Sequence, residues 1–333
     1  MTVTIKDIAR MAGVSHTTVS RALNDSPLIH EETKRKIRAI AERLDYTPNY
    51  SAKSLVLARS YHIGLFFSTL SKGTSSNFFH ETVKGVHSAV SSKYHLIVNA
   101  IDDYDGNFSP VTRKTFDGVI VMSQSDADES FIRYVADKSI PLVVLNRNAE
   151  RISPVNVLAD DRAGVFRVVE HMIAQGHRRI AIIEGKQSFK SSAARKDGYL
   201  QALGQYGVDT DPKLHVVGGY TLEGGYKAMK QLLRADPMPT AVFCSSDEMA
   251  VGAMKAIAEQ GLSVPDDMSV AGFDDDVFSA FLSPALTTVK RPVETISRIG
   301  AEKLLADIER GAPSRETVYV ETELVVRESV KPI

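Results

Sequence analysis

Four polar side chains near the start of one short predicted helix could form hydrogen bonds with the edges of base pairs. His16, Thr17, Ser20 and Arg21 face outward from the helix predicted over residues 16–23. Short polar groups with one arginine suit a helix that lies in the major groove of DNA, where a guanidinium can donate two hydrogen bonds to a guanine edge. The alternative is that these residues form the solvated face of a small three-helix bundle.

A second set of polar residues follows the apolar runs of the remaining chain. The segments concerned are 68–79, 146–147, 186–195, 219–220, 245–247 and 274–276. In open parallel sheets, ligands bind beyond the carboxyl ends of the strands, which is where these segments would lie. Their donors, acceptors and aromatic rings suit a neutral polyol such as a sugar. A structural role remains open for each, since Asp247 and the three aspartates 274–276 could cap helices and Tyr220 could lie in the core.

Three helix signals in residues 4–46 would position the first set. The helices are predicted at about 5–12, 16–23 and 31–44. Gly13 suits the turn after the first helix, and Ser15 can cap the second. The third helix is basic, with outward-facing cations at Lys34, Arg35, Lys36 and Arg38. Two helices joined by a glycine-containing turn and followed by a basic helix are typical of a helix-turn-helix.

From Tyr61 onward, short apolar runs alternate with helical stretches. Strands are predicted at 61–67, 95–100, 118–122, 142–145, 180–183, 215–217, 241–244 and 269–271, and helices at 78–90, 162–175, 193–206, 223–233, 247–260 and 293–310. One final strand is expected near 318–326. This alternation predicts doubly wound parallel α/β sheets. The stretch is longer than one such core usually needs, so two lobes are expected.

The predicted organisation is therefore an α/β protein with an added helical head. Its parts are a helix-turn-helix domain at 1–48, a linker at 49–60 and a core at 61–333, with lobe 1 at about 61–159 and 291–317 and lobe 2 at about 160–290 and 318–333. Charge follows the same division, because residues 1–60 carry a net charge of +4 and the remainder −5. A basic head on an acidic body favours one domain that meets a polyanion.

Several other classes of protein do not fit the sequence. No apolar run reaches about 18 residues, so no transmembrane helix or membrane partner is expected. Cys244 is the only cysteine, which rules out an intrachain disulfide, and Lys6, Asp7 and Arg10 stand where a signal peptide needs apolar residues. The expected compartment is the cytoplasm.

Motifs for catalysis, metals or cofactors are not found. His171 and His177 are six residues apart around a glycine and have no acidic or cysteine partner nearby, which is poor spacing for a metal site. The glycine-rich run GGYTLEGGY lacks the residues of a phosphate loop, and no Gly-x-Ser-x-Gly elbow occurs. No metal, cofactor or catalytic residue is therefore expected.

The head carries a resemblance to a known family. The run TIKDIARMAGVSHTTVSRALN and the later TKRKIRAIAERLDYTPNYSAKSL resemble the head of the LacI/GalR family of bacterial transcription regulators. The resemblance implies double-stranded DNA as a partner, with His16, Thr17 and Arg21 reading base edges. It also implies contacts to phosphates, which fix the register of binding. The residues implied for those contacts are Thr4, Ser15, Thr18, Ser20, Asn24 and Thr33.

The linker could form one short helix, which would be marginal alone in water. It resembles the hinge helix of the same family, which folds on DNA against its dimer mate. The resemblance implies that Asn49, Ala52 and Leu55 meet the minor groove and that Leu55 wedges into a base step and bends the duplex. An ordinary interdomain linker with a buried leucine is the alternative.

The body shares the resemblance through NFFHETVKGV, EHMIAQGHRRIAIIEG, AARKDGY, CSSDEMAVGAMKA, GFDDD and SPALTTVKRP. It implies a two-lobed fold similar to periplasmic sugar-binding proteins and an effector held by Arg195 and Asp274. The rest of that site would be lined by Phe78, Asn146, Tyr220 and Ser246. Relatives often have asparagine in place of Ser246 and aspartate in place of Asn146, which leaves the identity of the effector open. The loop 68–77 is longer than usual, and 102–116 is shorter. A longer lip on lobe 1 favours an oligosaccharide such as an α-galactoside over a purine. Variation of a surface loop with no effect on the ligand is the alternative.

These observations together predict a homodimeric repressor of carbohydrate-utilisation genes that binds an imperfectly palindromic operator and responds to a sugar. No heptad stretch occurs near residue 333, so a coiled-coil tetramer is not expected. Three alternatives stay open at this point: a regulator that responds to a purine or a phosphoprotein corepressor, a sugar-binding protein without a DNA role, and a sugar-modifying enzyme.

Overall fold

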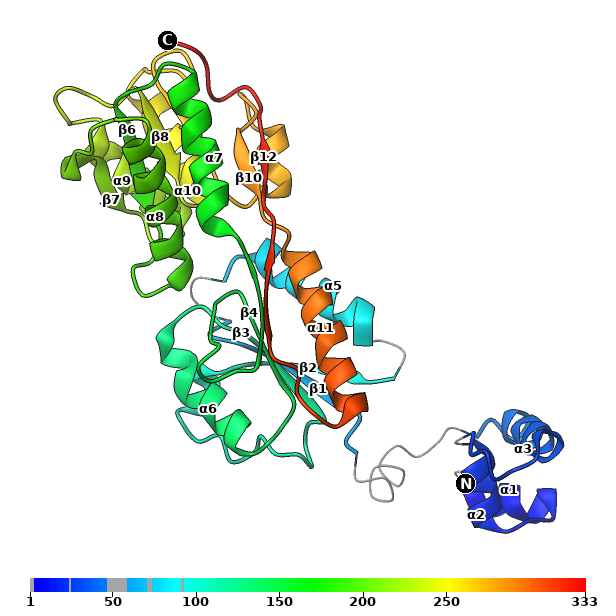
Figure 1. The fold of residues 1–333 in the computed structure, drawn as a ribbon. Coiled ribbons are helices and arrows are strands. Elements are labelled where there is room, and N and C mark those ends of the chain that lie inside the picture. The colour runs from blue at the N-terminus through cyan, green and yellow to red at the C-terminus, as the bar shows by residue number, and fades with distance from the viewer. Residues whose placement is uncertain (1–2, 24, 47–58, 71–73, 91–92) are drawn as a thin grey trace. The chain divides into compact units, whose positions relative to one another are not determined.

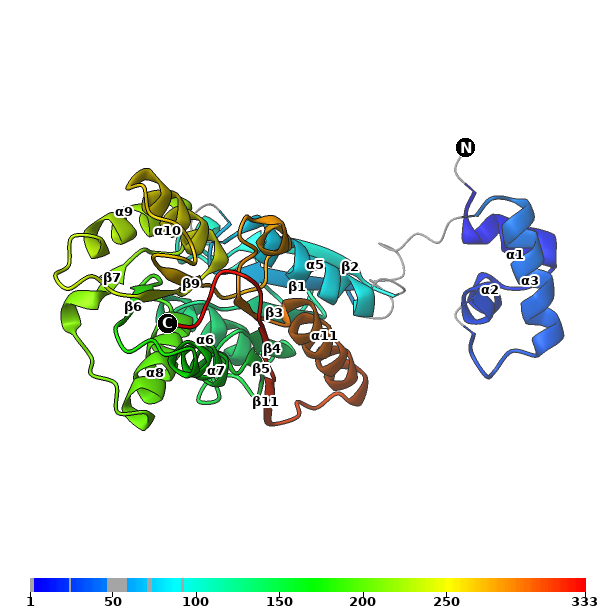
Figure 2. The ribbon, with the colours of Figure 1, turned by 90° about the horizontal axis from the view of Figure 1, so that it is seen from above.

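The computed structural model describes residues 3–23, 25–46, 59–70, 74–90 and 93–333. Internal contacts divide the chain into two units, Met1–Arg59 and Ser60–Ile333. Both units are drawn in Figures 1 and 2. In the described part of the chain, every helix is too short or too polar to cross a membrane.

The first unit is a three-helix bundle made of α1 (Ile5–Ala12), α2 (His16–Leu23) and α3 (Glu31–Arg43), as the sequence predicts. At the start of α1 the Thr4 backbone N–H donates to the Asp7 carboxylate at 3.0 Å. Gly13 ends that helix with φ +70°, a left-handed conformation that glycine adopts without strain. The core consists of the apolar face of each helix, namely Ile8, Ala9, Ala12, Val19, Ala22, Ile37 and Ala41.

Lobe 1 of the second unit is built on a parallel six-stranded sheet. Its strands are β1 (His62–Phe67), β2 (His95–Ala100), β3 (Gly118–Met122), β4 (Leu142–Leu145), β5 (Val155–Ala159) and β11 (Glu316–Val320), in the order β11-β5-β4-β3-β1-β2. Helices α5 (Ser76–Val90) and α11 (Val293–Arg310) pack together on one face, and α6 (Glu129–Asp137) packs on the other.

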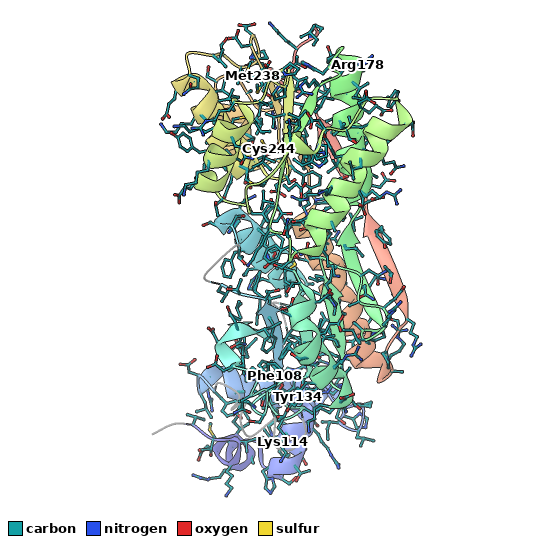
Figure 3. The ribbon with its side chains drawn as sticks, turned by 90° about the vertical axis from the view of Figure 1, so that its left-hand side faces the viewer. Phe108, Lys114, Tyr134, Arg178, Met238 and Cys244 are labelled. Atoms are coloured by element: carbon teal, nitrogen blue, oxygen red, sulfur yellow. The ribbon has the colours of Figure 1, made fainter. Side chains whose placement is uncertain are left out.

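The stretch between β2 and β3 has a short 3-10 turn, Asp102–Tyr104, and no α-helix. Its side chains still cover the sheet, because Val111 and Phe116 are buried in the same apolar cluster as α6. Phe108 and Tyr134 lie side by side in this cluster, with ring centroids 5.7 Å apart (Figure 3). Aromatic side chains from an irregular segment therefore cover this part of the sheet.

Lobe 2 is built on a parallel four-stranded sheet. Its strands are β6 (Ile180–Glu184), β7 (His215–Val217), β8 (Ala241–Cys244) and β9 (Ser269–Ala271), in the order β7-β6-β8-β9. Helices α7 (Asp161–Ala174) and α8 (Lys190–Gln205) cover one face, while α9 (Leu222–Leu232) and α10 (Asp247–Glu259) cover the other. Further 3-10 turns lie at Asp126–Asp128, Pro212–Leu214 and Val277–Phe281 (η4).

The prediction of one final strand near 318–326 is wrong. Two strands occupy this stretch: β11 pairs with β5 in lobe 1, and β12 (Glu323–Val325) pairs antiparallel with β10 (Thr288–Lys290) of lobe 2. Between them Thr322 is buried, and its hydroxyl donates to the Asp160 carbonyl at 3.2 Å. A continuous β-prone run does not reveal a change of pairing partner. The chain also crosses between the lobes after β5 and after β10. These two strands and the helix α6 are not among the elements predicted from the sequence.

Candidate nucleic-acid interface and ligand pocket

The outward face of α2 carries the predicted base-reading residues. His16, Thr17 and Arg21 are exposed, while Val19 and Ala22 on the opposite side are fully buried. Within the described residues, no hydrogen bond or ion pair holds the Arg21 guanidinium. The buried face of α2 therefore fixes the helix, and the donors of Arg21 stay available for another molecule.

The residues expected near phosphates have different local roles. Ser15 lies at the start of α2, where its hydroxyl accepts from the backbone N–H of Thr18 at 3.0 Å. Thr4 donates its hydroxyl to Asp7 at 2.7 Å, and Thr33 is half-buried on α3. Asn24 lies outside the described residues, as do the three residues expected at the minor groove, Asn49, Ala52 and Leu55.

The expectation that Lys34 faces outward is wrong. Lys34 is buried, and its ammonium pairs with Glu31 at 2.7 Å and with Asp25 at 3.1 Å. Arg38 also pairs with Asp25, at 2.8 Å, and the Lys36 ammonium donates to the Ala12 carbonyl at 3.1 Å. Much of the positive charge of α3 therefore stabilises the bundle, a use that the sequence pattern could not separate from DNA contact.

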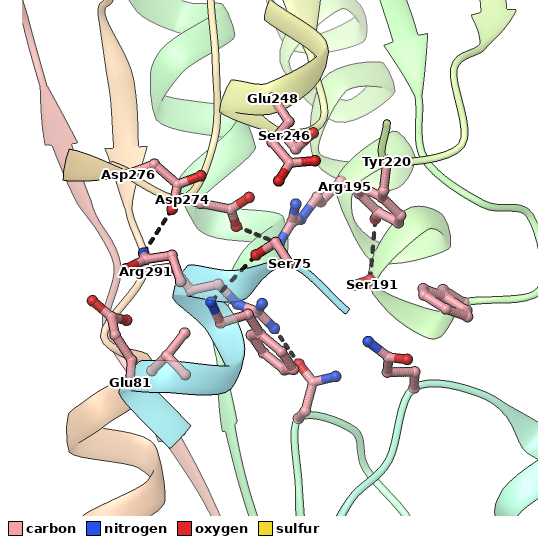
Figure 4. A pocket seen from close by; sticks show the side chains of 16 residues that line it. Ser75, Glu81, Ser191, Arg195, Tyr220, Ser246, Glu248, Asp274, Asp276 and Arg291 are labelled. Atoms are coloured by element: carbon pink, nitrogen blue, oxygen red, sulfur yellow. Dashed lines mark hydrogen bonds and ion pairs between the residues drawn. The ribbon is translucent and has the colours of Figure 1, made fainter. Parts of the chain in front are cut away.

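All six residues predicted to bind an effector line one pocket between the lobes of the second unit (Figure 4). Phe78 comes from α5, Asn146 follows β4, Arg195 belongs to α8, Tyr220 follows β7, Ser246 follows β8 and Asp274 follows β9. The pocket contains about 670 Å³ of empty space, part of it open to solvent. Residues that are up to 196 positions apart are brought together because the parallel strands end at this edge.

Ten further residues line the pocket: Ser75, Asn77, Glu81, Gln124, Phe189, Ser191, Glu248, Asp276, Arg291 and Val293. Five of them lie in segments that the sequence singled out after the strands. The other five carried no such signal. Glu81 lies inside α5, Gln124 lies beside a turn, and Arg291 lies on a crossover between the lobes. Glu248 and Val293 lie at the starts of α10 and α11.

Arg195 is a fixed cation of the pocket. Its side chain is buried, and Nε donates to Asp161 at 3.0 Å while Nη2 donates to Asp274 at 3.3 Å. The guanidinium also donates to the Ser245 carbonyl and lies over the Phe273 ring, 3.8 Å from its centroid. Burial alone would lower the pKa of Arg195, but the neighbouring negative charges raise that pKa above its usual value. The side chain is thus a permanently charged, preorganised donor.

Asp276 links the two lobes. Its carboxylate accepts a hydrogen bond of 2.6 Å from the side-chain amide of Asn77, which belongs to α5 of lobe 1. Burial, together with the charges of Asp274 and Asp247, raises the pKa of Asp276 to about 7. Near neutral pH this group therefore exchanges a proton at the contact between the lobes.

Asp247 has a structural role, although it does not cap a helix as the sequence allowed. Its carboxylate accepts hydrogen bonds from the Thr288 hydroxyl at 2.6 Å, the Ser279 hydroxyl at 2.7 Å and the Asp276 backbone N–H at 2.9 Å. Burial, followed by the charge of Asp274, raises the pKa of Asp247 to about 6. Ser246 is the cap of α10, since its hydroxyl accepts from the Met249 backbone N–H at 3.3 Å.

Replacing Asp276 with asparagine is expected to stabilise the ligand-free protein above pH 7. Because the pKa of Asp276 is about 7 in the folded chain and near 4 in an unfolded one, the free energy of unfolding falls as the pH rises between those values. Asparagine carries no charge to bury, so the variant should be more stable at pH 8 by about 1–3 kcal/mol. The difference should shrink towards pH 4 in thermal unfolding measurements.

Asp209→Asn supplies a control in the same lobe. Asp209 is exposed, so this substitution removes a charge from the surface and not a buried one. An Asp276→Asn variant with the same pH profile of unfolding as the unmodified chain would contradict the raised pKa.

Flat aromatic rings form part of the pocket wall. Tyr220 stacks on Phe189, with centroids 5.9 Å apart and planes 27° apart, and its hydroxyl lies within 3.1 Å of the hydroxyls of Ser191 and Ser192. Phe78 lies beneath the Arg291 guanidinium, 5.4 Å from it. Such rings can pack against the apolar face of a sugar while the surrounding polar groups bind its hydroxyls.

Asn146 holds the crossover between the lobes. Its side-chain amide donates to the Ser123 carbonyl at 2.9 Å, and its carbonyl oxygen accepts a hydrogen bond from Arg291. Asn146 has φ +72°, a left-handed conformation that asparagine tolerates better than most residues. This position therefore serves the backbone turn as well as the pocket.

Of the two histidines considered for metal binding, His177 has a structural role. His177 is buried, with one ring nitrogen 3.0 Å from the Thr240 hydroxyl and the other 3.1 Å from the Ser269 hydroxyl. Across the residues that the structure describes, His, Cys, Asp and Glu side chains do not gather in any group of three or more that could hold a metal ion. What the pocket offers chemically is a dense set of hydrogen-bond donors and acceptors beside aromatic rings.

Two family models match the chain. Residues 4–49 match "Bacterial regulatory proteins, lacI family", and residues 169–330 match "Periplasmic binding protein-like domain". The first match contains the three helices of the bundle, and the second contains most of lobe 2.

Similar proteins extend these matches over nearly the whole chain. A protein of Bacillus subtilis (strain 168) described as "Probable HTH-type transcriptional repressor ExuR" is 53% identical over 99% of this chain and 98% of its own length. The lac repressor dimer bound to operator and the anti-inducer ONPF superposes with a TM-score of 0.84 at 27% identity, over 99% of this chain and 100% of that one. The complex of the transcriptional regulator CelR with cellobiose has a TM-score of 0.73 at 27% identity, over 98% of this chain and 99% of that one.

Proposed function

This chain belongs to the LacI family of bacterial regulatory proteins, which are DNA-binding regulators of transcription, and on that premise we propose that it represses carbohydrate-utilisation genes under the control of a sugar. The observation that carries the proposal is the convergence of all six expected effector residues on one polar pocket between the lobes. The sugar would change how the lobes close and thereby the affinity of the head for its operator.

The DNA-binding half of the proposal assigns base reading to His16, Thr17 and Arg21. Their exposure on one face of α2 supports this role, as does the freedom of the Arg21 guanidinium. Thr4, Ser15, Thr18, Ser20, Asn24 and Thr33 would contact phosphates, and Asn49, Ala52 and Leu55 would meet the minor groove. Two heads in a symmetric dimer would read an imperfect palindrome.

The chemistry of the pocket favours a sugar as effector. Only Phe78, Phe189 and Val293 among its sixteen lining residues are apolar, and the others present hydroxyl, amide, carboxylate or guanidinium groups. A polyol can use that many polar partners, whereas a purine has few edge groups and needs larger apolar walls. The CelR complex contains a disaccharide, cellobiose, in a protein of similar fold, which supports an oligosaccharide as one form of the effector.

The test is a panel of monosaccharides, disaccharides, α-galactosides and purines. Each compound is scored for a shift in the melting temperature of the full chain, for chemical turnover and for a change in affinity for an operator duplex. The operator is first selected by the chain from a random pool. We expect one class of sugar to shift the melting temperature and the operator affinity without turnover. Product formation would contradict the proposal. A response only to purines, or only to a phosphoprotein from a cell extract, would show that the effector is not a sugar.

We also propose a homodimer in the cytoplasm without enzymatic activity. The 3-10 turn η4 presents an apolar surface next to the pocket, since it directly follows Asp276, and its first and last residues, Val277 and Phe281, are 74% and 83% exposed. Phe278 of the same turn is exposed as well, and neighbouring exposed apolar side chains are typical of sites of protein association. A second copy of the chain is the proposed occupant, because two heads are needed for a palindromic operator.

Replacing Phe281 with aspartate is therefore expected to shift the chain from dimer to monomer in sedimentation experiments, because a charge cannot be buried at an apolar interface without a partner. Operator affinity should fall with it. Tyr319→Asp is the matched control, since Tyr319 is an exposed aromatic residue on β11 of lobe 1. A Phe281→Asp variant that remains dimeric would place the interface elsewhere.

A further inference from the structure

One carboxylate holds the junction where the chain enters the second unit. The backbone N–H and the hydroxyl of Ser60 donate to Oδ1 of Asp117 at 2.6 and 3.0 Å, and the backbone N–H of Tyr61 donates to Oδ2 at 3.1 Å. Asp117 immediately precedes β3, which lies inside the lobe 1 sheet between β1 and β4. The first residues of the core are thus fastened to the middle of that sheet by a residue 57 positions away.

The junction has a constrained backbone conformation. Tyr61 has φ +58°, a left-handed value that is unfavourable for a residue with a bulky side chain. The conformation is held by the buried Tyr61 ring, by the hydrogen bond from the His95 backbone N–H to the Tyr61 carbonyl at 2.8 Å, and by Asp117. The Ser60 hydroxyl also accepts from the His62 backbone N–H at 3.2 Å, which ties the junction to the start of β1.

A flexible joint cannot transmit the movement of one part of a protein to another. If the torsions at Ser60 and Tyr61 were free, a shift of lobe 1 would be absorbed there and would not reach the preceding linker. Local strain that surrounding contacts maintain is found where a conformation serves a function. The clamp lies between the pocket-bearing core and the segment that leads to the head.

We propose that Asp117 is a positioning residue for allosteric control, because its carboxylate makes the junction rigid and so couples lobe 1 to the linker. The inference rests on the proposed function, since it supposes a sugar-dependent change in operator affinity. Asp117 touches neither the effector nor DNA in this mechanism, and it acts through Ser60 and Tyr61.

Asparagine at position 117 tests the proposal with little change in shape. Its amide offers one acceptor oxygen in place of two, and its NH₂ group would face a backbone N–H, so at least one arm of the clamp is lost. Asp307→Asn is the matched control: the Asp307 carboxylate likewise accepts from the backbone N–H of Ser314 at 3.1 Å and from its hydroxyl at 2.9 Å, at the end of α11 in the same lobe.

The experiment uses the full chain, an operator duplex that the unmodified protein has selected from a random pool, and the sugar that shifts its melting temperature. The readout is the ratio of operator affinities without and with that sugar, beside the affinity for the sugar itself. Asp117→Asn is expected to bring the ratio at least threefold closer to 1 while sugar affinity changes less than twofold. Asp307→Asn should leave the ratio unchanged at a similar melting temperature. Should Asp117→Asn fail to fold, Ser60→Ala removes the hydroxyl bonds alone and is expected to move the ratio in the same direction.

The possible outcomes separate the two proposals. If the unmodified chain selects no operator or its operator affinity ignores every sugar, the proposed function fails. If the unmodified chain responds and Asp117→Asn responds equally, or if Asp307→Asn loses the response to the same extent, the role of Asp117 alone is overturned.

Discussion

Replacing Asp274 with asparagine is expected to leave operator binding intact and to abolish most of the response to the sugar. The Asp274 carboxylate faces the pocket and pairs with the Arg195 guanidinium at 3.3 Å, so it is placed to accept hydrogen bonds from sugar hydroxyls. Hydrogen bonds to a charged group contribute about 1.5–3 kcal/mol, so sugar affinity should fall by about 10- to 150-fold. The measurement is a titration of the sugar against the chain, followed by operator binding at saturating sugar.

Asparagine is chosen over alanine because Asp274 has φ +119°, where most residues with a side chain are strained. Asp275→Asn is the matched control. Asp275 is the next residue and also has a positive φ, but its carboxylate pairs with Arg327 at 2.6 Å and the residue does not line the pocket. If Asp274→Asn responds like the unmodified chain, or Asp275→Asn loses the response equally, the assignment of Asp274 to the effector is wrong.

Replacing Arg21 with alanine is expected to remove discrimination between operator and other duplexes. A bidentate arginine–guanine contact contributes about 1–3 kcal/mol of discrimination at each half-site, whereas contacts to phosphates are independent of sequence. Binding to the operator should therefore weaken by about 5- to 150-fold per half-site, while salt-sensitive binding to random DNA is largely kept. Fluorescence anisotropy with both duplexes at several salt concentrations measures the difference.

Arg35→Ala is the control for Arg21→Ala, because Arg35 is an exposed arginine of the same bundle that lies on α3. It should weaken both duplexes slightly and by the same factor. An Arg21→Ala variant that loses affinity for operator and random DNA equally would make Arg21 a phosphate contact, and base reading would then have to come from His16 and Thr17.

The candidate site was predictable to the extent that its residues follow strands. Phe78, Asn146, Arg195, Tyr220, Ser246 and Asp274 were named from the sequence and its family resemblance, and the pocket contains all six. Arg291 was missed because it lies on the crossover after β10, a three-residue strand that the apolar pattern did not reveal, and Val293 was missed because it opens α11 and does not follow the end of a strand. Glu81 was missed because a charged residue inside a helix normally faces solvent.

The sequence by itself determined the local structure. The periodicity of residues 5–43 indicated three helices, and the turn at Gly13 and the exposure of His16, Thr17 and Arg21 followed from side-chain type and spacing. The same holds for most strands of the core, since an apolar run bounded by polar turns depends only on neighbouring residues.

Only the tertiary structure decided which distant residues meet. It assigned β11 to one lobe and β12 to the other, buried Lys34 between two carboxylates, and joined Asn77 to Asp276 and Ser60 to Asp117. Such pairs depend on strand pairing and on the packing of whole lobes, which bring together residues far apart in the chain. Hydrophobic periodicity carries no information about those long-range partners, so neither the division of charge in the bundle nor the contacts between the lobes could be read from the sequence.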